Sequence, residues 1–354
     1  MAKAQRRRSA RKTRRARAFD LAESSEGDWM VRTTPPRPVD IVALFPELAA
    51  HSRTTIRLHP RQGDPTFADS SFGGPLLWPA EEPWPECGEV HPGDWRHAVW
   101  TREPRRRVFK RRWERDSGLP DFEPDEAEAH VLTRIAAGLD PADGALPLIP
   151  IMQLYTRDVP GLAGPPGADM LQVLWCPADH EPDWMPRIRL FWRQTSEIDQ
   201  VLATPPIPTV IYRDDYWPEP CVLHPEQVTE YPHRTHLPDK LRQQIDDRDE
   251  SLPNDSGLDY QNNLSVAQGV KVGGWAPWSF SDPSPTYCRV CDSLMQPFIY
   301  IDSGEWDSNQ HWMPLEDRIA GASKTPSINI GRSYGMQIYS CPASFDHPHA
   351  EVMQ

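Results

Sequence analysis

The chain has 354 residues, of which 38% are hydrophobic and 40 are proline, and its formal net charge is −13. This length exceeds one compact core and suits two domains of ordinary size, and the apolar content excludes a globally disordered chain. So many prolines argue against long helices and favour short strands joined by ordered turns. The sequence has no apolar run of 18 or more residues, so neither a transmembrane helix nor a membrane partner is expected.

Positive charge is concentrated at the start of the chain. Residues 1–17 contain nine Lys or Arg and no acid, so the remainder carries −13 − 9 = −22. Such a segment could be an RNA- or ribosome-binding arm but is more commonly a solvated extension, and we predict a disordered basic tail over residues 1–30. No hydrophobic stretch follows it, so a secretory signal is not expected. The six cysteines are then expected to stay reduced in the cytoplasm, where thiolates bind metal more often than they form disulfides.

The first predicted unit, residues 31–237, is β-rich. Its segments LPLIPIMQLY, MLQVLWC and RIRLFWR are apolar, β-branched and aromatic, and each is bounded by Pro or Gly, which indicates buried strands. A charged, helix-like insert from about residue 95 to residue 139 interrupts the unit. Its run REPRRRVFKRRWER could contact phosphate, although a solvated face paired with nearby acids is more typical.

A helix and linker, residues 238–262, separate this unit from the second one. The segment is charged and then polar, which is typical of an exposed helix that ends at a domain boundary. The second unit, residues 263–354, contains the strand-like segments PFIYID and MQIYSC and a Cys-x2-Cys turn. The sequence therefore predicts an α+β, β-rich fold of two similar antiparallel-sheet units with short helices and a helical insertion in the first.

An ordered set of landmarks recurs in the two units and indicates an internal duplication. The segments FGGPLLWP (72–79) and VGGWAPW (272–278) both place Trp four residues after a Gly-Gly pair. A Met-Gln pair then follows in each unit. Finally, LQVLWCP (171–177) and MQIYSCP (336–342) align without a gap, with Gln four residues before Cys and Pro directly after it.

A zinc site is predicted in the second unit. Cys288-x2-Cys291 has the spacing of a zinc knuckle, in which two thiolates of one turn face the same ion. Cys341 and His347 follow the aligned strand and could complete the set. His349 competes with His347 as the fourth ligand, and the sequence does not choose between them.

The repeat predicts a second zinc site in the first unit. At the equivalent places stand Cys87-x3-His91 and Cys176-x3-His180. Four-coordinate zinc with mixed Cys and His ligands fits both sets, and four protein ligands leave no position for a reactive water, so both sites would be structural. The alternative interpretation is that these are small buried thiols at strand ends, with exposed histidines.

Other chemistry-bearing residues give weaker signals. Cys221 and His224 form a pair without a partner in the repeat, and we interpret them as structural. Two acidic pairs, in SGEWD (303–307) and LEDR (315–318), are expected to be ordinary surface carboxylates. The sequence has no nucleophile elbow, paired-histidine metalloprotease helix or kinase motif set, so catalysis is disfavoured.

These motifs resemble those of a known family. FGGPLLWP, the Met-Gln and Leu-Gln strands, and KVGGWAPW are similar to the bacterial YwqG-like family, a domain of unknown function with a duplicated β-rich architecture. With YCRVC, MQPFIYID and QIYSCP, the second unit also resembles the C-terminal domain of programmed cell death protein 2 and its ribosome-biogenesis relative Tsr4. The resemblance covers roughly residues 65–354.

The resemblance implies metal ligands and a binding role. The eukaryotic domains have one Cys pair where Cys288 and Cys291 stand and another where Cys341 and His347 stand, so His347 departs from their all-Cys pattern. Their role as chaperones of a ribosomal protein, and the suggested role of bacterial relatives as immunity proteins beside toxins, imply a protein partner.

Our leading hypothesis is a non-catalytic protein-binding module, stabilised by structural zinc, whose Trp-rich or acidic surface holds a basic partner such as a ribosomal protein or a toxin. The alternative is an RNA- or ribosome-associated protein that uses the tail and the insert around residues 105–112. A metal-dependent enzyme is less expected, because it needs an open coordination position.

Overall fold

A computed structural model of the chain describes residues 31–89, 91, 97–98, 145–208, 210–211, 214–252, 258–307, 309–320 and 326–354. The basic tail predicted over 1–30 lies outside the described residues, and so does the predicted helical insert apart from 97–98. Arg32–Gln354 form one compact unit.

The described residues form two six-stranded sheets and two short ribbons, so the prediction of a β-rich fold is confirmed. The first sheet has the order β12 (Glu226–Glu230), β1 (Arg53–Arg57), β13 (Lys271–Gly273), β14 (Gln296–Asp302), β15 (Gly335–Ser340) and β16 (Ala350–Met353). The second has the order β2 (Arg61–Gln62), β11 (Cys221–Val222), β3 (Ser71–Phe72), β7 (Ile149–Tyr155), β8 (Met170–Trp175) and β9 (Ile188–Arg193). The ribbons pair β4 (Glu86–Cys87) with β6 (Leu146–Pro147) and β5 (His97–Ala98) with β10 (Val210–Ile211). Every described strand pair is antiparallel.

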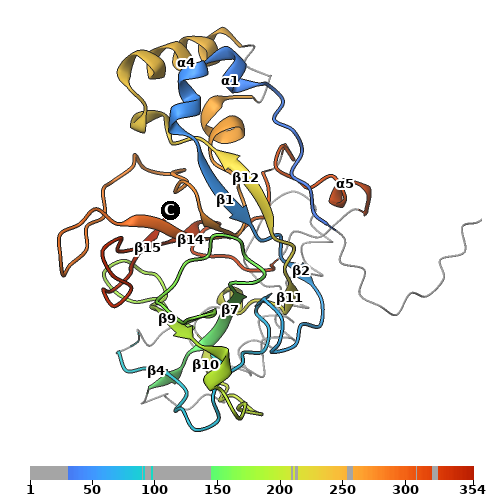
Figure 1. Cartoon of the computed structure of the whole chain (residues 1–354), viewed down its shortest axis with the longest axis vertical. Helices are drawn as coiled ribbons and strands as arrows, with labels where there is room; N and C mark the ends of the chain where they lie inside the picture. The colour runs from blue at the N-terminus through green and yellow to red at the C-terminus, as the bar shows by residue number, and fades with distance from the viewer. Residues whose placement is uncertain are drawn as a thin grey trace, which may run out of the picture. The chain divides into compact units, whose positions relative to one another are not determined.

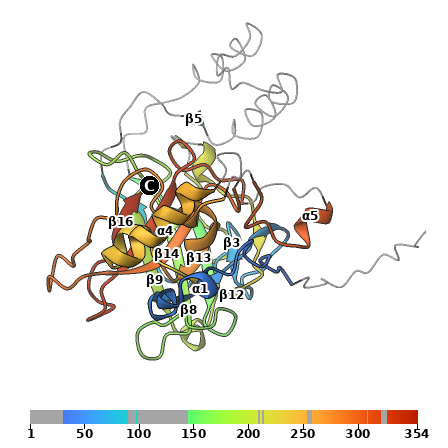
Figure 2. The same ribbon diagram turned by 90° about the horizontal axis from the view of Figure 1, so that it is seen from above.

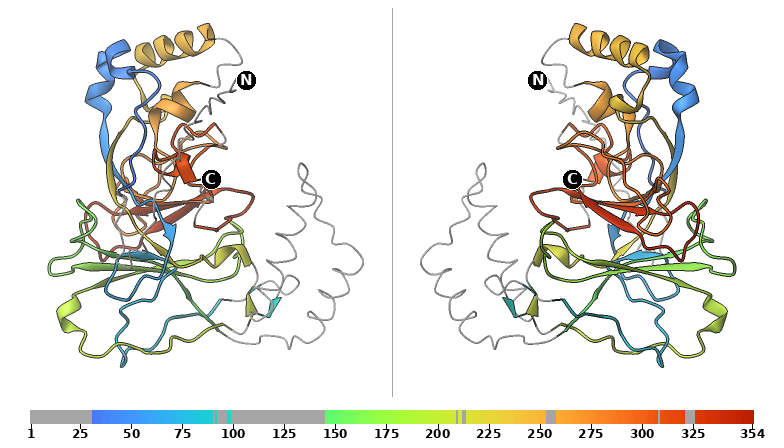
Figure 3. Two further views of the ribbon diagram at one scale, coloured as in Figure 1. Left: turned by 90° about the vertical axis from the view of Figure 1, so that its right-hand side faces the viewer. Right: turned by 90° about the vertical axis from the view of Figure 1, so that its left-hand side faces the viewer.

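The two sheets pack on each other through one apolar core. Val272, Ile299 and Ile338 of the first sheet share a buried cluster with Ile151 and Val173 of the second. Within β8, the members of this cluster are Leu171, Val173 and Trp175, which stand at alternate positions and so lie on one face of the sheet. Figure 3 shows the two sheets as stacked layers, the red and orange strands beside the green and blue ones.

The helices of the described residues are short, as the proline content predicts. They are α1 (Ile41–Leu44), η1 (Pro46–His51), α4 (Asp239–Ser251), η7 (Tyr260–Ser265) and α5 (Asp317–Ala320), with the single turns η4 (Thr195–Glu197), η5 (Asp214–Tyr216) and η6 (Arg234–His236). α4 buries Leu241 and Ile245 against Ile41 of α1 and Tyr260 of η7. Figures 1 and 2 show α1 and α4 side by side. Within the described part of the chain, none of the helices has the length and apolarity needed to cross a membrane.

The first sheet draws strands from both predicted units. β1 and β12 fall within residues 31–237, yet β1 pairs with β12 on one side and with β13 on the other. The linker predicted over 238–262 contains α4 but does not separate one sheet from the other. Pairing across about two hundred residues is settled by tertiary packing, which a local sequence pattern does not reveal.

The last four strands of the two sheets follow the same plan. The order β3-β7-β8-β9 in one sheet matches β13-β14-β15-β16 in the other. A register shift interrupts β7 between Pro150 and Met152, and another interrupts β14 between Pro297 and Ile299. The strands that follow these bulges, β8 and β15, each lead into a candidate metal ligand.

A glutamine contact is also shared by the two sheets. On β8, Nε2 of Gln172 donates to the carbonyl of Leu77 at 2.9 Å. On β15, Nε2 of Gln337 donates to the carbonyl of Pro277, which follows its Gly-Gly pair at the same spacing. Each glutamine therefore ties its strand to the segment between the Gly-Gly pair and the next tryptophan.

Candidate metal centres

The first Cys/His set joins two strand ends and the turn that follows one of them. Cys87 is the last residue of β4, and Cys176 directly follows β8. The backbone N–H of Cys176 donates to Arg187, and that of His180 donates to Met185, so a hairpin turn carries His180 back toward the two sulfurs. The sequence predicted these four residues as one set, and the structure brings them together.

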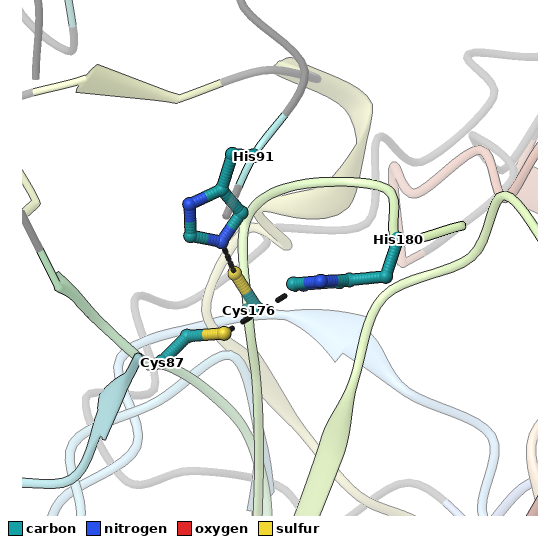
Figure 4. A group of neighbouring side chains, drawn as sticks. All are labelled: Cys87, His91, Cys176 and His180. Carbon is teal, nitrogen blue, oxygen red and sulfur yellow. Dashed lines mark hydrogen bonds between the residues drawn. The ribbon is translucent and has the colours of Figure 1, made fainter. Parts of the chain in front are cut away.

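The donor atoms of this set face one another (Figure 4). Sγ of Cys87 lies 3.7 Å from Nε2 of His180, and Sγ of Cys176 lies 3.2 Å from Nε2 of His91. One donor atom from each of the four residues lies within 4.8 Å of the others. A tetrahedral zinc site with Zn–S of about 2.3 Å has edges of about 3.8 Å, so the spacing fits a tetrahedral ion.

The surroundings of the first set are apolar, with one carboxylate. Cys87 and Cys176 belong to a buried cluster with Trp78. Oε2 of Glu89 lies 3.1 Å from Nδ1 of His180, close enough for an ion pair although the angle is not that of a good hydrogen bond. A carboxylate behind the second ring nitrogen is a common support for a metal-binding histidine, because it orients the ring and raises its basicity.

The second set is built on a tight turn. Tyr287 and Leu294 are bridged, and the backbone N–H of Cys288 donates to Ser293 at 2.9 Å. Inside the turn, the N–H of Val290 points at Sγ of Cys288 at 3.5 Å. The predicted Cys-x2-Cys turn is therefore present, and one of its backbone N–H groups donates to the sulfur of Cys288.

The strand end after β15 supplies the other half of this set. Sγ of Cys341 lies 3.5 Å from Sγ of Cys291 and 3.3 Å from Nδ1 of His347. Nδ1 of His347 is also 3.6 Å from Sγ of Cys288. His349 turns away and contacts the carbonyl of Ile188 at 3.1 Å. Between the two histidines that the sequence left open, the geometry favours His347.

The thiols of each set affect one another's ionisation. The hydrogen bond with Cys176 lowers the pKa of Cys87, while the same contact raises the pKa of Cys176. In the second set, hydrogen bonding with Ser293 lowers the pKa of Cys291 to about 6. A bound cation would allow the remaining thiols to ionise, because metal binding and thiol deprotonation are linked.

The residues present therefore fit a metal ion in both places. Each set has four donors of the types that zinc prefers, Cys2His2 in one and Cys3His in the other. The structure identifies the donor sets, while the identity of the ion is a proposal. Cys221 is in neither set: burial raises the pKa of its thiol to about 12, and its Sγ donates to the carbonyl of Glu219.

The expectation of surface carboxylates is wrong for Glu305 and Asp317. Both are buried, with 0% and 3% of their surface exposed. Oε1 of Glu305 lies 2.8 Å from Nδ1 of His59, while Asp317 pairs with Arg61. Buried carboxylates need such partners, because an unpaired buried charge is costly.

Sequence reasoning missed the basic side of this network. Arg57, His59 and Arg61 stand at every second position of RLHPR, which in a fully extended chain would place them on one face, although His59 itself has φ +44°. That spacing was the available signal. Nε2 of His59 lies 3.1 Å from Glu226, and Arg57 donates to the carbonyl of Glu305. These contacts join segments far apart in the chain, so we interpret the network as structural.

Comparison with known proteins adds no assignment. A scan against protein-family models finds no match, and a search of the curated proteins finds none either. The function of the chain must therefore be inferred from its two Cys/His sets and from its distribution of charge.

Proposed function

We propose that the chain is a non-catalytic protein-binding module of the YwqG-like type, in which structural zinc holds two duplicated units and a basic protein is the partner. The observation that carries this proposal is the presence of two closed sets of four Cys and His donors. Four protein ligands fill a tetrahedral shell, which is the property of zinc sites that stabilise a fold rather than activate water.

Zinc is the ion that suits these donors best. Thiolates and imidazoles together select soft or borderline metals, and the absence of carboxylates from both sets disfavours calcium and magnesium. Zinc has no redox chemistry of its own, so it would serve only to fix the strand ends to the turns. Because the proposed zinc ions lie within the fold, the outer surface of the chain stays free to bind a partner.

Internal duplication is supported by the structural parallels. The last four strands of each sheet share their order, the first long hairpin of each is bulged, and Gln172 and Gln337 make the same backbone contact. Each Cys/His set also packs beside the tryptophan that follows its Gly-Gly pair, Trp78 or Trp278. Independent units would have no reason to share all of these features.

A basic partner follows from the charge. Residues 18–354 carry −13 − 9 = −22, once the nine positive charges of residues 1–17 are set apart. A surface this acidic attracts a basic protein at long range and raises its rate of association. The reducing environment that would keep the six cysteines as free thiols also makes the cytoplasm the proposed compartment.

The test is capture of a partner at low salt, followed by reconstitution from purified proteins. We expect one discrete basic protein, with an affinity that falls as the salt concentration rises because the attraction is screened. An unrelated protein of equal isoelectric point is the matched control and should bind at least tenfold more weakly. Equal binding of the two, or no partner above background at low salt, would contradict the proposal.

The Arg-rich segments favour a second candidate, association with RNA. Residues 1–17 hold nine positive charges, and neutralised phosphates make such binding strongly salt-dependent. Deletion of residues 1–17 should then abolish retention of RNA by the full chain. Retention that survives the deletion, or none in the full chain, would remove this candidate.

A further inference from the structure

The two Cys/His sets differ in how their sulfur atoms meet solvent. Cys291 is exposed, whereas Cys87 and Cys176 of the first set are only 5% and 0% exposed. Thiol oxidation requires access to the sulfur as well as a reactive thiolate. A small oxidant in solution therefore reaches Cys291 before it reaches either cysteine of the first set.

Cys291 also has a second sulfur within reach. Its Sγ lies 3.5 Å from Sγ of Cys341. A disulfide has an S–S length of about 2.05 Å, so the two atoms must approach by about 1.5 Å. Residues 289–292 are all exposed, so this part of the turn can shift without disturbing the core. Cys341 stays in place at the end of β15, packed beside Trp278.

We propose that Cys291 and Cys341 form a hydroperoxide-sensitive thiol pair, whose oxidation dismantles the second metal centre and leaves the first intact. The inference rests on the metal-binding role given above to the two sets. Formation of the disulfide removes two of the four donors of the second set. The remaining donors, Cys288 and His347, are too few to hold zinc tightly.

The chemistry balances with hydrogen peroxide as the oxidant. The Cys291 sulfur, as a thiolate, attacks one peroxide oxygen, the O–O bond breaks, and the released hydroxide takes a proton from the solvent to become water. The sulfenic acid on Cys291 is then attacked by Cys341: the S–S bond forms, the S–O bond breaks, and a second water leaves. Two thiols lose two electrons in total, and one peroxide gains them. A dithiol reductant reverses the change.

The experiment adds peroxide to full-length protein loaded with zinc and follows metal release with a chromogenic chelator. Intact mass and peptide mapping then identify the disulfide. We expect release of one zinc per chain, a mass loss of two hydrogens, and a link between Cys291 and Cys341. Reduction in the presence of zinc should restore the original content.

Two variants sharpen the result. Cys291→His keeps a donor atom but has no sulfur, so it should need at least tenfold more peroxide to lose its zinc. Cys221→Ser removes a buried cysteine that belongs to neither set, and it should respond as the unaltered chain does. The disulfide map of the unaltered chain decides the question even if Cys291→His does not fold.

The results distinguish a failure of this inference from a failure of the proposed function. Protein that binds no zinc at all would overturn the proposed function together with this inference. Protein that binds two zinc ions but loses both together, or loses none, would overturn the inference alone. A disulfide between Cys87 and Cys176, or between Cys288 and Cys291, would likewise contradict the pairing.

Discussion

The buried ion pair between Glu230 and Lys271 is the residue-scale contact with the clearest energetic consequence. Nζ of Lys271 donates to Oε1 of Glu230 at 2.5 Å, and both side chains are 0% exposed. The same carboxylate accepts from the backbone N–H groups of Ala267 and Trp275. Burial lowers the pKa of Lys271, while the carboxylate of Glu230 acts in the opposite direction and favours the charged ammonium.

Lys271→Met should therefore destabilise the protein by about 3–5 kcal/mol, since it leaves a buried carboxylate without its counter-ion. Chemical unfolding measures the change. Lys240→Met, at an exposed position of α4, is the matched control and should change stability by less than about 0.5 kcal/mol. Equal effects of the two substitutions would mean that the buried pair does not stabilise the fold.

His224 gives a prediction about pH. Burial lowers its pKa from 6.5 to about 4, and the nearby guanidinium groups of Arg32 and Arg61 act in the same direction, against Asp317. The unfolded chain binds a proton at this residue at a higher pH than the folded chain does. The contribution of neutral His224 to the free energy of unfolding is therefore complete above pH 6.5 and is lost as the pH falls toward 4.

Unfolding free energies measured from pH 7 to pH 4 should fall less steeply in His224→Gln than in the unaltered chain. Comparing slopes rather than absolute values separates this residue from the metal ligands, which also take up protons in that range. Parallel slopes would show that His224 ionises alike in both states.

At the scale of elements, the Gly-Gly pairs lie where the backbone must turn and pass close to neighbouring groups. Gly274 has φ +75°, and a Cβ there would lie 2.3 Å from Oε2 of Glu230 and 2.7 Å from Cβ of Thr55. The left-handed backbone and the close approach both require glycine. A left-handed backbone recurs at the first glycine of each pair, Gly73 (φ +66°) and Gly273 (φ +70°), which helps to explain why the repeat was recognisable in the sequence.

Gly274→Ala should destabilise the fold by at least about 1–2 kcal/mol, the usual strain of a side chain in the left-handed region, with the steric clash added. Gly304→Ala is the comparison, since its backbone is unstrained and the nearest atom to its Cβ would be 3.7 Å away. Thermal unfolding of both variants measures the difference. If Gly304→Ala were as damaging, the explanation through the Gly-Gly turn would fail.

Some elements could be predicted from the sequence, and others could not. β7, β8, β14 and β15 are apolar runs bounded by turn residues. β7, β8 and β15 are buried along most of their length, and β14 is buried at Ile299, Tyr300 and Ile301. β1 reads RTTIR, a short and largely polar segment, and its place beside β13 depends on contacts with the distant chain. Local pattern carries no information about such partners.

The candidate site was more predictable than the topology. Cys and His are the residues that bind zinc, and the repeat showed which of them occupy equivalent places, so all eight donors could be named. The choice of His347 over His349 required coordinates, since both follow Cys341 within a few residues. The network of Arg57, His59 and Glu305 also could be found only from the structure, because its acidic residues come from segments far away in the sequence.

At the scale of the whole molecule, the two Cys/His sets bring together distant parts of the chain, which the proposed metal ions would fasten to one another. One set joins β4 to the end of β8, and the other joins a turn to the end of β15. Closing such long loops stabilises the folded state mainly by restricting the unfolded one.

The most direct test is the zinc content of full-length protein purified without chelator or histidine tag, measured by elemental mass spectrometry. We expect two zinc ions per chain, and one in each of the variants Cys87→Ser and Cys288→Ser, with Cys221→Ser retaining both. A chain without zinc, or variants that keep two, would show that the Cys and His residues are packing positions rather than ligands.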